Sequence, residues 1–198
     1  MPNRIRSLFL AAAITLAAPV CVQAADRPAE AGAQVKSDLY VTATEAWALM
    51  QADPSVVLVD VRDPVEAMFT GFASDTDIHV PYMMADRSSL NAEKGTFAMK
   101  VNPSFATEME ARLAALGADR ATTKVIFMCR SGSTRSAPAA DLLHARGWAR
   151  TYTMVDGFEG NTRKDGPSKG VRDVDGWRNA GLPWSYRLPS GVVYVAAP

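Results

Sequence analysis

The sequence predicts an α/β fold built on a largely parallel central sheet. Two short runs, 56–59 and 125–128, consist almost entirely of apolar and β-branched residues without polar alternation, which is typical of strands buried on both faces. Between them, apolar residues recur at helical spacing over 103–116. Strands that alternate with helices in this way form parallel sheets. We see no internal repeat, so we expect a single copy of this unit.

The remaining elements follow from local signals. Thr42 and Glu45 form a capping-box pattern, Pro64 suits the first turn of a helix, and Gly117 and Gly147 are suited to ending helices. We expect, in chain order, a helix after Thr42, a strand over 56–59, a helix over 64–69, a strand over 78–81, a polar loop over 85–102, a helix over 103–116, a strand over 125–128, a helix over 137–146, a strand over 152–155, a loop over 160–172 and a last short helix from Trp177.

The N-terminus has the pattern of a secretory signal peptide over residues 1–24. Arg4 and Arg6 precede a short apolar run, and Val22-Gln23-Ala24 fits the small-residue cleavage pattern. The run is too short to span a bilayer comfortably. A lipoprotein attached at Cys21 is the alternative, but a small residue is missing just before it. We therefore predict a periplasmic or secreted protein, with a disordered lead-in over 25–37, one domain over 38–187 and a tail over 188–198.

Charge and histidine content limit the classes of partner. The chain has 198 residues, with 21 basic and 21 acidic side chains that are interspersed along it. Because no basic cluster is present, we expect no nucleic-acid partner and, after signal cleavage, no membrane partner. The two histidines, His79 and His144, and the cysteine Cys129 have no metal-ligand spacing, so we predict neither a metal nor a cofactor.

Cysteine usage singles out one thiol. Of the two cysteines, Cys21 lies in the predicted signal peptide, which leaves Cys129 without a partner in the mature chain. Exported proteins usually pair their thiols. An unpaired one is either a buried inert side chain or a reactive group.

The loop after Cys129 favours the reactive alternative. Cys129 follows the buried strand 125–128 and precedes a helix, which is where ligands bind in open α/β sheets. Backbone amides of such a loop can form a nest for an anion, and the helix N-terminus adds positive potential. Both effects favour the thiolate form of Cys129 over the thiol, and the positive charges of Arg130 and Arg135 favour it further. We predict Cys129 as the nucleophile and the next six residues as its anion-binding loop: Arg130, Ser131, Gly132, Ser133, Thr134 and Arg135.

These residues resemble a known active-site loop. Cys129-Arg130-Ser131-Gly132 ahead of Arg135-Ser136 is similar to the loop of rhodanese-family sulfurtransferases. Over residues 39–186 other segments resemble the family in order and spacing: Asp60-Val61-Arg62, Val80-Pro81-Tyr82, Gly157-Phe158-Glu159-Gly160 and the stretch from Gly176 to Trp184. The resemblance implies a rhodanese-like central parallel sheet flanked by helices. It also implies structural roles for Asp60 and Arg62.

The resemblance implies a ping-pong sulfur transfer. Cys129 would take the outer sulfur of thiosulfate or a persulfide donor, release sulfite in the case of thiosulfate, and become a persulfide. Cyanide, a thiol or a protein acceptor would then remove that sulfur. By position, Arg130 and Arg135 would bind the oxygens of the small anionic donor, and the loop amides with Ser131, Ser133 and Thr134 would stabilise the persulfide.

Two other functions stay open at the level of sequence. The spacing Cys129-x5-Arg135-Ser136 also fits cysteine-dependent phosphatases and arsenate reductases, although Met128 stands where such phosphatases typically have His. In that case Asp156 or Glu159 could act as a general acid. The third possibility is a non-catalytic sulfur carrier that delivers its sulfur to one protein.

Overall fold

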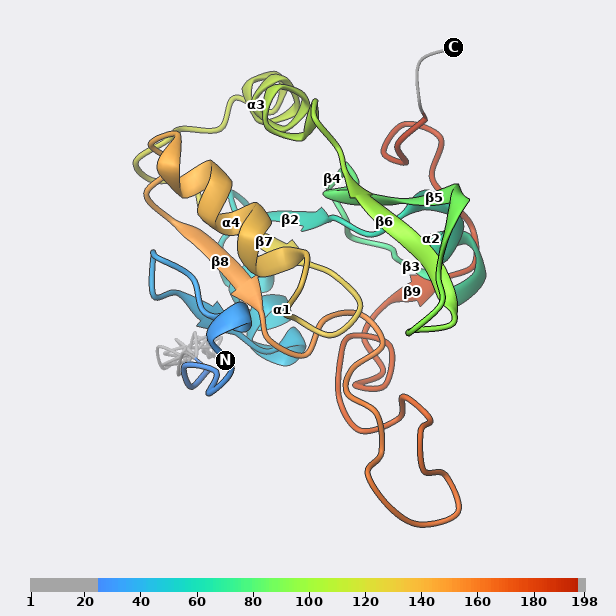
Figure 1. Ribbon diagram of the computed structural model, residues 1–198. Coiled ribbons are helices and arrows are strands. Elements are labelled where there is room, and N and C mark those ends of the chain that lie inside the picture. The colour runs from blue at the N-terminus through green and yellow to red at the C-terminus, as the bar shows by residue number, and fades with distance from the viewer. Residues whose placement is uncertain (1–24, 196–198) are drawn as a thin grey trace, which may run out of the picture.

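The computed structural model describes residues 25–195 and shows a parallel sheet at the centre of the molecule (Figure 1). The predicted signal peptide, residues 1–24, and the last three residues of the predicted tail lie outside the described residues. All neighbouring strands of the five-stranded sheet are parallel. Their order is β1 (Tyr40–Val41), β8 (Thr151–Met154), β7 (Val125–Met128), β2 (Val57–Asp60) and β4 (Ile78–His79). The predicted α/β class with a parallel sheet is confirmed.

Within residues 25–195, four α-helices and one short 3-10 helix accompany the sheet. Thr42 and Glu45 form the expected capping box, and Asp63 caps the helix that begins at Pro64 by accepting from the Val65 amide. The elements are η1 (Ala31–Ala33), α1 (Ala43–Ala52), α2 (Pro64–Thr70), α3 (Phe105–Ala115) and α4 (Ser136–Ala145). The helices predicted for these four stretches are confirmed, with ends that differ by a few residues.

The sheet separates two hydrophobic clusters. Side chains along a strand alternate between its faces, so Val125 and Phe127 of β7 pack with α3 and α4, whereas Ile126 and Met128 pack with α1. This two-sided burial explains why the strand sequences lack polar residues. Helix α2 differs from the others, because Ala67 is its only buried residue.

The largest difference from the sequence prediction is a β-hairpin over residues 83–101. We predicted a polar loop over 85–102, which is wrong: β5 (Met83–Asn91) pairs antiparallel with β6 (Thr96–Val101). The hairpin forms its own two-stranded sheet rather than joining the central one. Its side chains are exposed or half-buried, so the burial pattern that reveals a core strand is missing.

The C-terminal part also differs. The short helix predicted from Trp177 is wrong, because residues 177–181 form turns instead; Gly176, just before them, and Gly181, at their end, adopt positive φ angles. Beyond them, β9 (Trp184–Ser185) pairs antiparallel with β3 (Phe72–Ala73). The tail continues along the domain to Tyr194, whose amide donates to His79 Nδ1 at 3.2 Å.

The segment 25–37, expected to be a disordered lead-in, contacts the domain in the structure. Ala33 and Val35 are buried, and the Val35 amide donates to Tyr40 Oη at 3.0 Å. The Lys36 amide donates to Asp141 of α4 at 2.6 Å. Residues 25–37 therefore pack against the domain through these contacts, although their own sequence has neither helical nor strand periodicity.

A buried ion pair joins the end of β2 to α2. Asp60 and Arg62 are both fully buried, and Arg62 Nε donates to each Asp60 carboxylate oxygen at 3.0 Å. Arg62 also donates to Thr70 Oγ1 at 2.8 Å and to the Gly71 carbonyl at 3.0 Å. Although burial opposes ionisation, Arg62 lowers the pKa of Asp60 below its ordinary value. The pair therefore remains charged and fixes the C-terminal end of α2.

Replacement of Arg62 by Met should destabilise the fold strongly, because Asp60 would stay buried without its counter-charge. We expect a loss of about 3–5 kcal/mol in the free energy of unfolding, measured by urea titration. Arg27→Met is the control, since Arg27 pairs with Asp38 on the exposed surface and should cost less than about 1 kcal/mol. Equal losses in the two variants would contradict this role of the buried pair.

Candidate active site

Cys129 lies where the sequence placed it, between the end of β7 and the start of α4. Its side chain is only 2 % exposed. The Cys129 carbonyl accepts from the Phe158 amide at 2.8 Å, and the Arg130 carbonyl accepts from the Glu159 amide at 2.9 Å. The segment 157–160 thus holds the beginning of the loop from one side, which fixes the thiol at the carboxyl edge of the sheet.

A chain of two hydroxyl groups ends at the thiol. Ser136 Oγ lies 3.3 Å from Cys129 Sγ. On its other side, Ser136 Oγ accepts a hydrogen bond from Thr153 Oγ1 of β8 at 3.0 Å. Because its lone pair receives the Thr153 proton, Ser136 is oriented to donate its own proton to the sulfur. Ser136 and Thr153 are both fully buried.

The surroundings of Cys129 favour its thiolate. Burial alone would raise the pKa of the Cys129 thiol, but the Arg135 guanidinium, the Ser136 hydroxyl and the backbone amides of Ser136 and Ser131 together lower it below its ordinary value. These are the effects by which a protein activates a cysteine nucleophile.

Both loop arginines are paired with carboxylates. Arg135 makes a two-pronged ion pair with Glu66 of α2, in which Nη2 donates to Oε1 at 3.0 Å and Nη1 donates to Oε2. Arg130 donates through Nε to the buried carboxylate of Glu159, which also lies 3.3 Å from Arg178. The Arg130 side chain is still 45 % exposed, so of the two loop arginines it is the more open to an incoming anion.

Two glycines allow the close packing of the loop. Gly132 has a φ of +79°, and a Cβ there would lie 2.1 Å from the Val155 carbonyl oxygen. Gly157 has a φ of +63°, and a Cβ there would lie 2.6 Å from the Cys129 carbonyl oxygen. Any side chain at Gly157 would therefore clash with the backbone of the loop that begins at Cys129.

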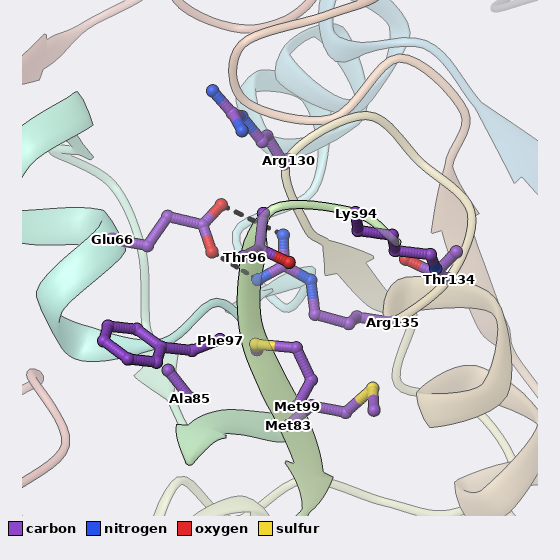
Figure 2. Close-up of a pocket in the computed structure, with 10 residues that line it drawn as sticks. All are labelled: Glu66, Met83, Ala85, Lys94, Thr96, Phe97, Met99, Arg130, Thr134 and Arg135. Atoms are coloured by element: carbon purple, nitrogen blue, oxygen red, sulfur yellow. Dashed lines mark hydrogen bonds and ion pairs between the residues drawn. The ribbon is translucent and has the colours of Figure 1, made fainter. Parts of the chain in front are cut away.

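Two cavities flank the loop. The hairpin cavity, about 460 Å³, is drawn in Figure 2 and is lined by Arg130, Thr134 and Arg135 of the loop together with Glu66, Met83, Ala85, Lys94, Thr96, Phe97 and Met99. The N-terminal cavity, about 380 Å³, is lined by Ser131, Gly132 and Ser133 together with residues of 26–33, Val155 and Asn161. The seven predicted site residues are therefore one loop, but six of them divide between two cavities and Cys129 lines neither.

His79 and Asp156, two other titratable residues of the sequence, are bound to backbone groups of the fold. His79 is buried, and its Nε2 lies 2.9 Å from the Arg62 carbonyl oxygen. Asp156 accepts from the Ala43 amide at 2.8 Å and from the Gly176 amide at 3.1 Å, and burial raises its pKa to about 6. It thus connects the start of α1 to the turn at Gly176 rather than facing either cavity.

Sequence reasoning missed the partners that complete the site. Glu66, Thr153 and the hairpin residues come from elements distant in sequence from the loop, and Glu66 is separated from Arg135 by 69 positions. Ser136 adjoins the loop, but only its contact with Cys129 reveals its role. Within residues 25–195, no three His, Cys, Asp or Glu side chains gather as a metal site. Over the same range, no helix is long and apolar enough to cross a membrane.

Removal of the Ser136 hydroxyl should raise the pKa of Cys129. We expect Ser136→Ala to shift the pH profile of Cys129 alkylation upward, because the thiolate loses a donor. Thr153→Val should shift it upward by less, since Ser136 remains but is no longer oriented. In the unmodified protein, alkylation should proceed as a thiolate well below pH 8. A profile with the midpoint of an ordinary thiol, or one unaffected by Ser136→Ala, would contradict the arrangement.

The chain resembles several known proteins. A curated relative from Rickettsia prowazekii, "Uncharacterized protein RP600", is 26 % identical over 147 residues, which are 74 % of this chain and 96 % of the relative. The protein RC0915 of Rickettsia conorii matches to the same extent. Among solved structures, Rv0390 from M. tuberculosis has a TM-score of 0.54 and 29 % identity, and the match covers 75 % of this chain and 97 % of that one.

A second solved structure is the polysulfide-sulfur transferase homodimer from Wolinella succinogenes. It has a TM-score of 0.40 and 23 % identity, and the match covers 74 % of this chain and 77 % of that one. The Rhodanese-like domain family matches residues 42–164, which include α1, the loop 129–135 and the hairpin. The resemblance seen in the sequence is confirmed, and the coarse function that it supports is of the sulfurtransferase type. This chain belongs to the family of rhodanese-like domain proteins.

Proposed function

We propose that this protein is an exported sulfurtransferase that carries a sulfane sulfur as a Cys129 persulfide. The observation that carries the proposal is the buried thiol, which lies 3.3 Å from the Ser136 hydroxyl and next to the Arg135 charge. A thiolate held in this way is a nucleophile. The same donors can stabilise the negative charge of a persulfide.

The first half-reaction uses an anionic donor such as thiosulfate. The Cys129 thiolate attacks the outer sulfur, the sulfur–sulfur bond of thiosulfate breaks, and its electron pair leaves with sulfite. Arg130, whose side chain is the more exposed of the two loop arginines, supplies positive charge for the donor oxygens. No proton and no external oxidant or reductant is required.

The second half-reaction regenerates the thiolate. Cyanide or a thiolate acceptor attacks the outer sulfur of the persulfide, and the electron pair of the cleaved bond returns to Cys129. Cyanide leaves as thiocyanate, and a thiolate leaves as a new persulfide. A protein acceptor fits the same step, in which case the protein would act as a sulfur carrier.

Oxyanion hydrolysis or reduction has less support. In a phosphatase-type loop the arginine must be free to bind the oxygens of the tetrahedral substrate. Here both Nη groups of Arg135 donate hydrogen bonds to Glu66. Sulfur transfer needs Arg135 only as a nearby charge. Asp156, considered as a general acid, is engaged by two backbone amides instead.

Incubation with thiosulfate should add the mass of one sulfur atom to the protein, and cyanide should remove it. Steady-state kinetics with both substrates should give the parallel double-reciprocal lines of a ping-pong mechanism. Cys129→Ser is the control and should show neither the mass increase nor turnover. The proposal would be abandoned if no donor, thiosulfate or persulfide, produced the sulfur adduct on Cys129. If the protein instead turned over an aryl phosphate or arsenate, and Cys129→Ser abolished that turnover, the phosphatase or arsenate-reductase alternative would take the place of sulfur transfer.

Export rests on the signal-peptide pattern of residues 1–24. Expression of the full chain in a bacterium with a periplasm should yield protein whose intact mass corresponds to a start at Ala25. The mature protein should lie in the periplasmic or secreted fraction. Uncleaved protein confined to the cytoplasm would contradict this part of the proposal without affecting the sulfur chemistry.

A further inference from the structure

Between β8 and β9 the chain forms an arm, residues 161–175, which Figure 1 shows as the orange loop that projects away from the central sheet. The arm consists of turns and irregular backbone, apart from an isolated antiparallel bridge between Thr162 and Arg172. Loops of this length without helices or strands of their own are uncommon in compact domains, and they usually either serve a function or are disordered. The match to the Rhodanese-like domain family ends at residue 164, so most of the arm lies beyond it.

Backbone and side-chain hydrogen bonds hold the arm in an ordered conformation. At its base, Asn179 Nδ2 donates to the carbonyl oxygens of Glu159 and Asp175, each at 2.9 Å. Nearer the tip, the Arg163 amide donates to the Val171 carbonyl at 2.8 Å, which joins the two sides of the arm. Of the two alternatives for a long loop, function is therefore favoured over disorder.

The base of the arm adjoins the loop that begins at Cys129. The Glu159 amide donates to the Arg130 carbonyl at 2.9 Å, and the Gly160 amide donates to the same carbonyl at 3.2 Å. Arg172, near the end of the arm, donates through Nη1 to the Gly160 carbonyl at 2.5 Å. Partial burial and the nearby positive charge of Arg130 both lower the pKa of Arg172 below its ordinary value. Two arginines therefore meet where the arm joins the Cys129 loop.

The exposed part of the arm carries an excess of positive charge. Residues 161–172 contain one acidic side chain, Asp165, and four basic ones: Arg163, Lys164, Lys169 and Arg172. Asp173 pairs with Arg163 at 3.0 Å, whereas Lys164 and Lys169 are exposed near the tip. The whole chain has equal numbers of basic and acidic side chains, so this excess is a local feature, and only the fold adds Arg130 to it.

Apolar side chains accompany the charges of the arm. Val171 is 52 % exposed and Val174 is 54 % exposed. Protein interfaces typically combine apolar contacts with a polar, charged rim. Residues 161–175 include no aromatic side chain on which a nucleic-acid base could stack, and no aromatic or leucine side chain that could insert into a membrane. The composition of the arm therefore favours a protein with an acidic surface as its partner.

We propose that the arm docks an acidic protein whose thiol accepts the sulfur from the Cys129 persulfide. The assignment rests on the proposed function and specifies its acceptor class. Thiosulfate is too small to contact the Cys129 loop and the tip of the arm at once, whereas a protein can contact both. Attraction between the lysines of the arm and the acidic surface increases the rate of encounter.

The transfer step needs no other reactant. The acceptor thiolate attacks the outer sulfur of the persulfide, and a new sulfur–sulfur bond forms on the acceptor. The bond between that sulfur and Cys129 Sγ breaks, and its electron pair returns to Cys129 as the thiolate. Charge and electrons therefore balance between the two proteins.

Two peptide acceptors test the charge separately from the chemistry. One has the sequence Glu-Glu-Gly-Cys-Gly-Glu-Glu, and the other has Gln in place of each Glu. With thiosulfate as donor, the unmodified protein should have the higher kcat/KM for the acidic peptide. The double variant Lys164→Gln, Lys169→Gln should lower the ratio of the two kcat/KM values by about threefold to tenfold. Because the intrinsic reactivity of each thiol is the same with both proteins, it cancels in this comparison.

A second double variant, Lys36→Gln with Arg150→Gln, is the matched control. Both side chains are exposed, and Ser37 Oγ donates to the Thr151 carbonyl at 2.6 Å, so residues 36–37 lie near the start of β8. Because the sheet is parallel, the start of β8 lies at the edge opposite Cys129. The control removes the same amount of charge and should leave the ratio unchanged. A salt concentration of about 1 M, at which charges are screened beyond about 3 Å, should remove the preference of the unmodified protein.

Equilibrium binding supplies a readout without turnover. Labelled peptides with Ser in place of Cys should bind the unmodified protein in fluorescence anisotropy, the acidic one more tightly, and the variant at Lys164 and Lys169 should remove most of the difference. Sulfur transfer with the same ratio in the unmodified protein and in this variant would overturn the inference and leave the proposed function intact. Binding to phosphatidylglycerol vesicles that depends on the two lysines, without a preference for the acidic peptide, would overturn it in favour of a membrane. Failure of every donor to form a persulfide would overturn the proposed function and the acceptor assignment together.

Discussion

The buried pair of Asp60 and Arg62 is the constraint on which the rest of the site depends. Arg62 contacts the end of β2 through Asp60 and the end of α2 through Thr70 and Gly71, and its guanidinium lies 4.1 Å from the centre of the Phe158 ring. Because the Phe158 amide donates to the Cys129 carbonyl, the Arg62 side chain connects the sheet, α2 and the segment that contacts the Cys129 loop. A fixed α2 in turn directs Glu66 toward Arg135. The motif Asp-x-Arg therefore helps to position the Cys129 loop although Arg62 bonds to Asp60, Thr70 and Gly71 rather than to the sulfur.

Charge around Cys129 is balanced rather than simply positive. Each loop arginine has its own carboxylate, Glu66 for Arg135 and Glu159 for Arg130. These pairs keep the guanidinium groups in place without an anion, while their charge still favours a thiolate or persulfide. The direct donors to the sulfur are smaller groups, namely the Ser136 hydroxyl and two backbone amides. Such donors suit a single sulfur atom, which needs little space and few contacts.

Local patterns in the sequence were sufficient to predict the framework of the fold and the position of the Cys129 loop within it. Buried strand runs, the capping box at Thr42 and the loop after Cys129 each depend on neighbouring residues, and the structure contains all three. The sequence does not reveal the hairpin because its exposed strands lack a buried face, and the pattern at 177–181 predicts a helix where Gly176 and Gly181 instead favour turns. Glu66 and Thr153 were missed because only tertiary packing brings them to the loop. The sequence predicted Cys129 as the nucleophile, but it did not reveal which residues distant along the chain contact its loop.

The central claim is that the loop after Cys129 holds one sulfur atom bonded to Cys129 Sγ. A crystal structure of the protein after exposure to thiosulfate tests this claim most directly. We expect electron density for one additional atom bonded to Cys129 Sγ, within contact distance of the Ser131 and Ser136 amides, with the pair of Arg135 and Glu66 intact. An unbonded tetrahedral anion gripped by Arg135, with Glu66 displaced and Cys129 unmodified, would contradict the account.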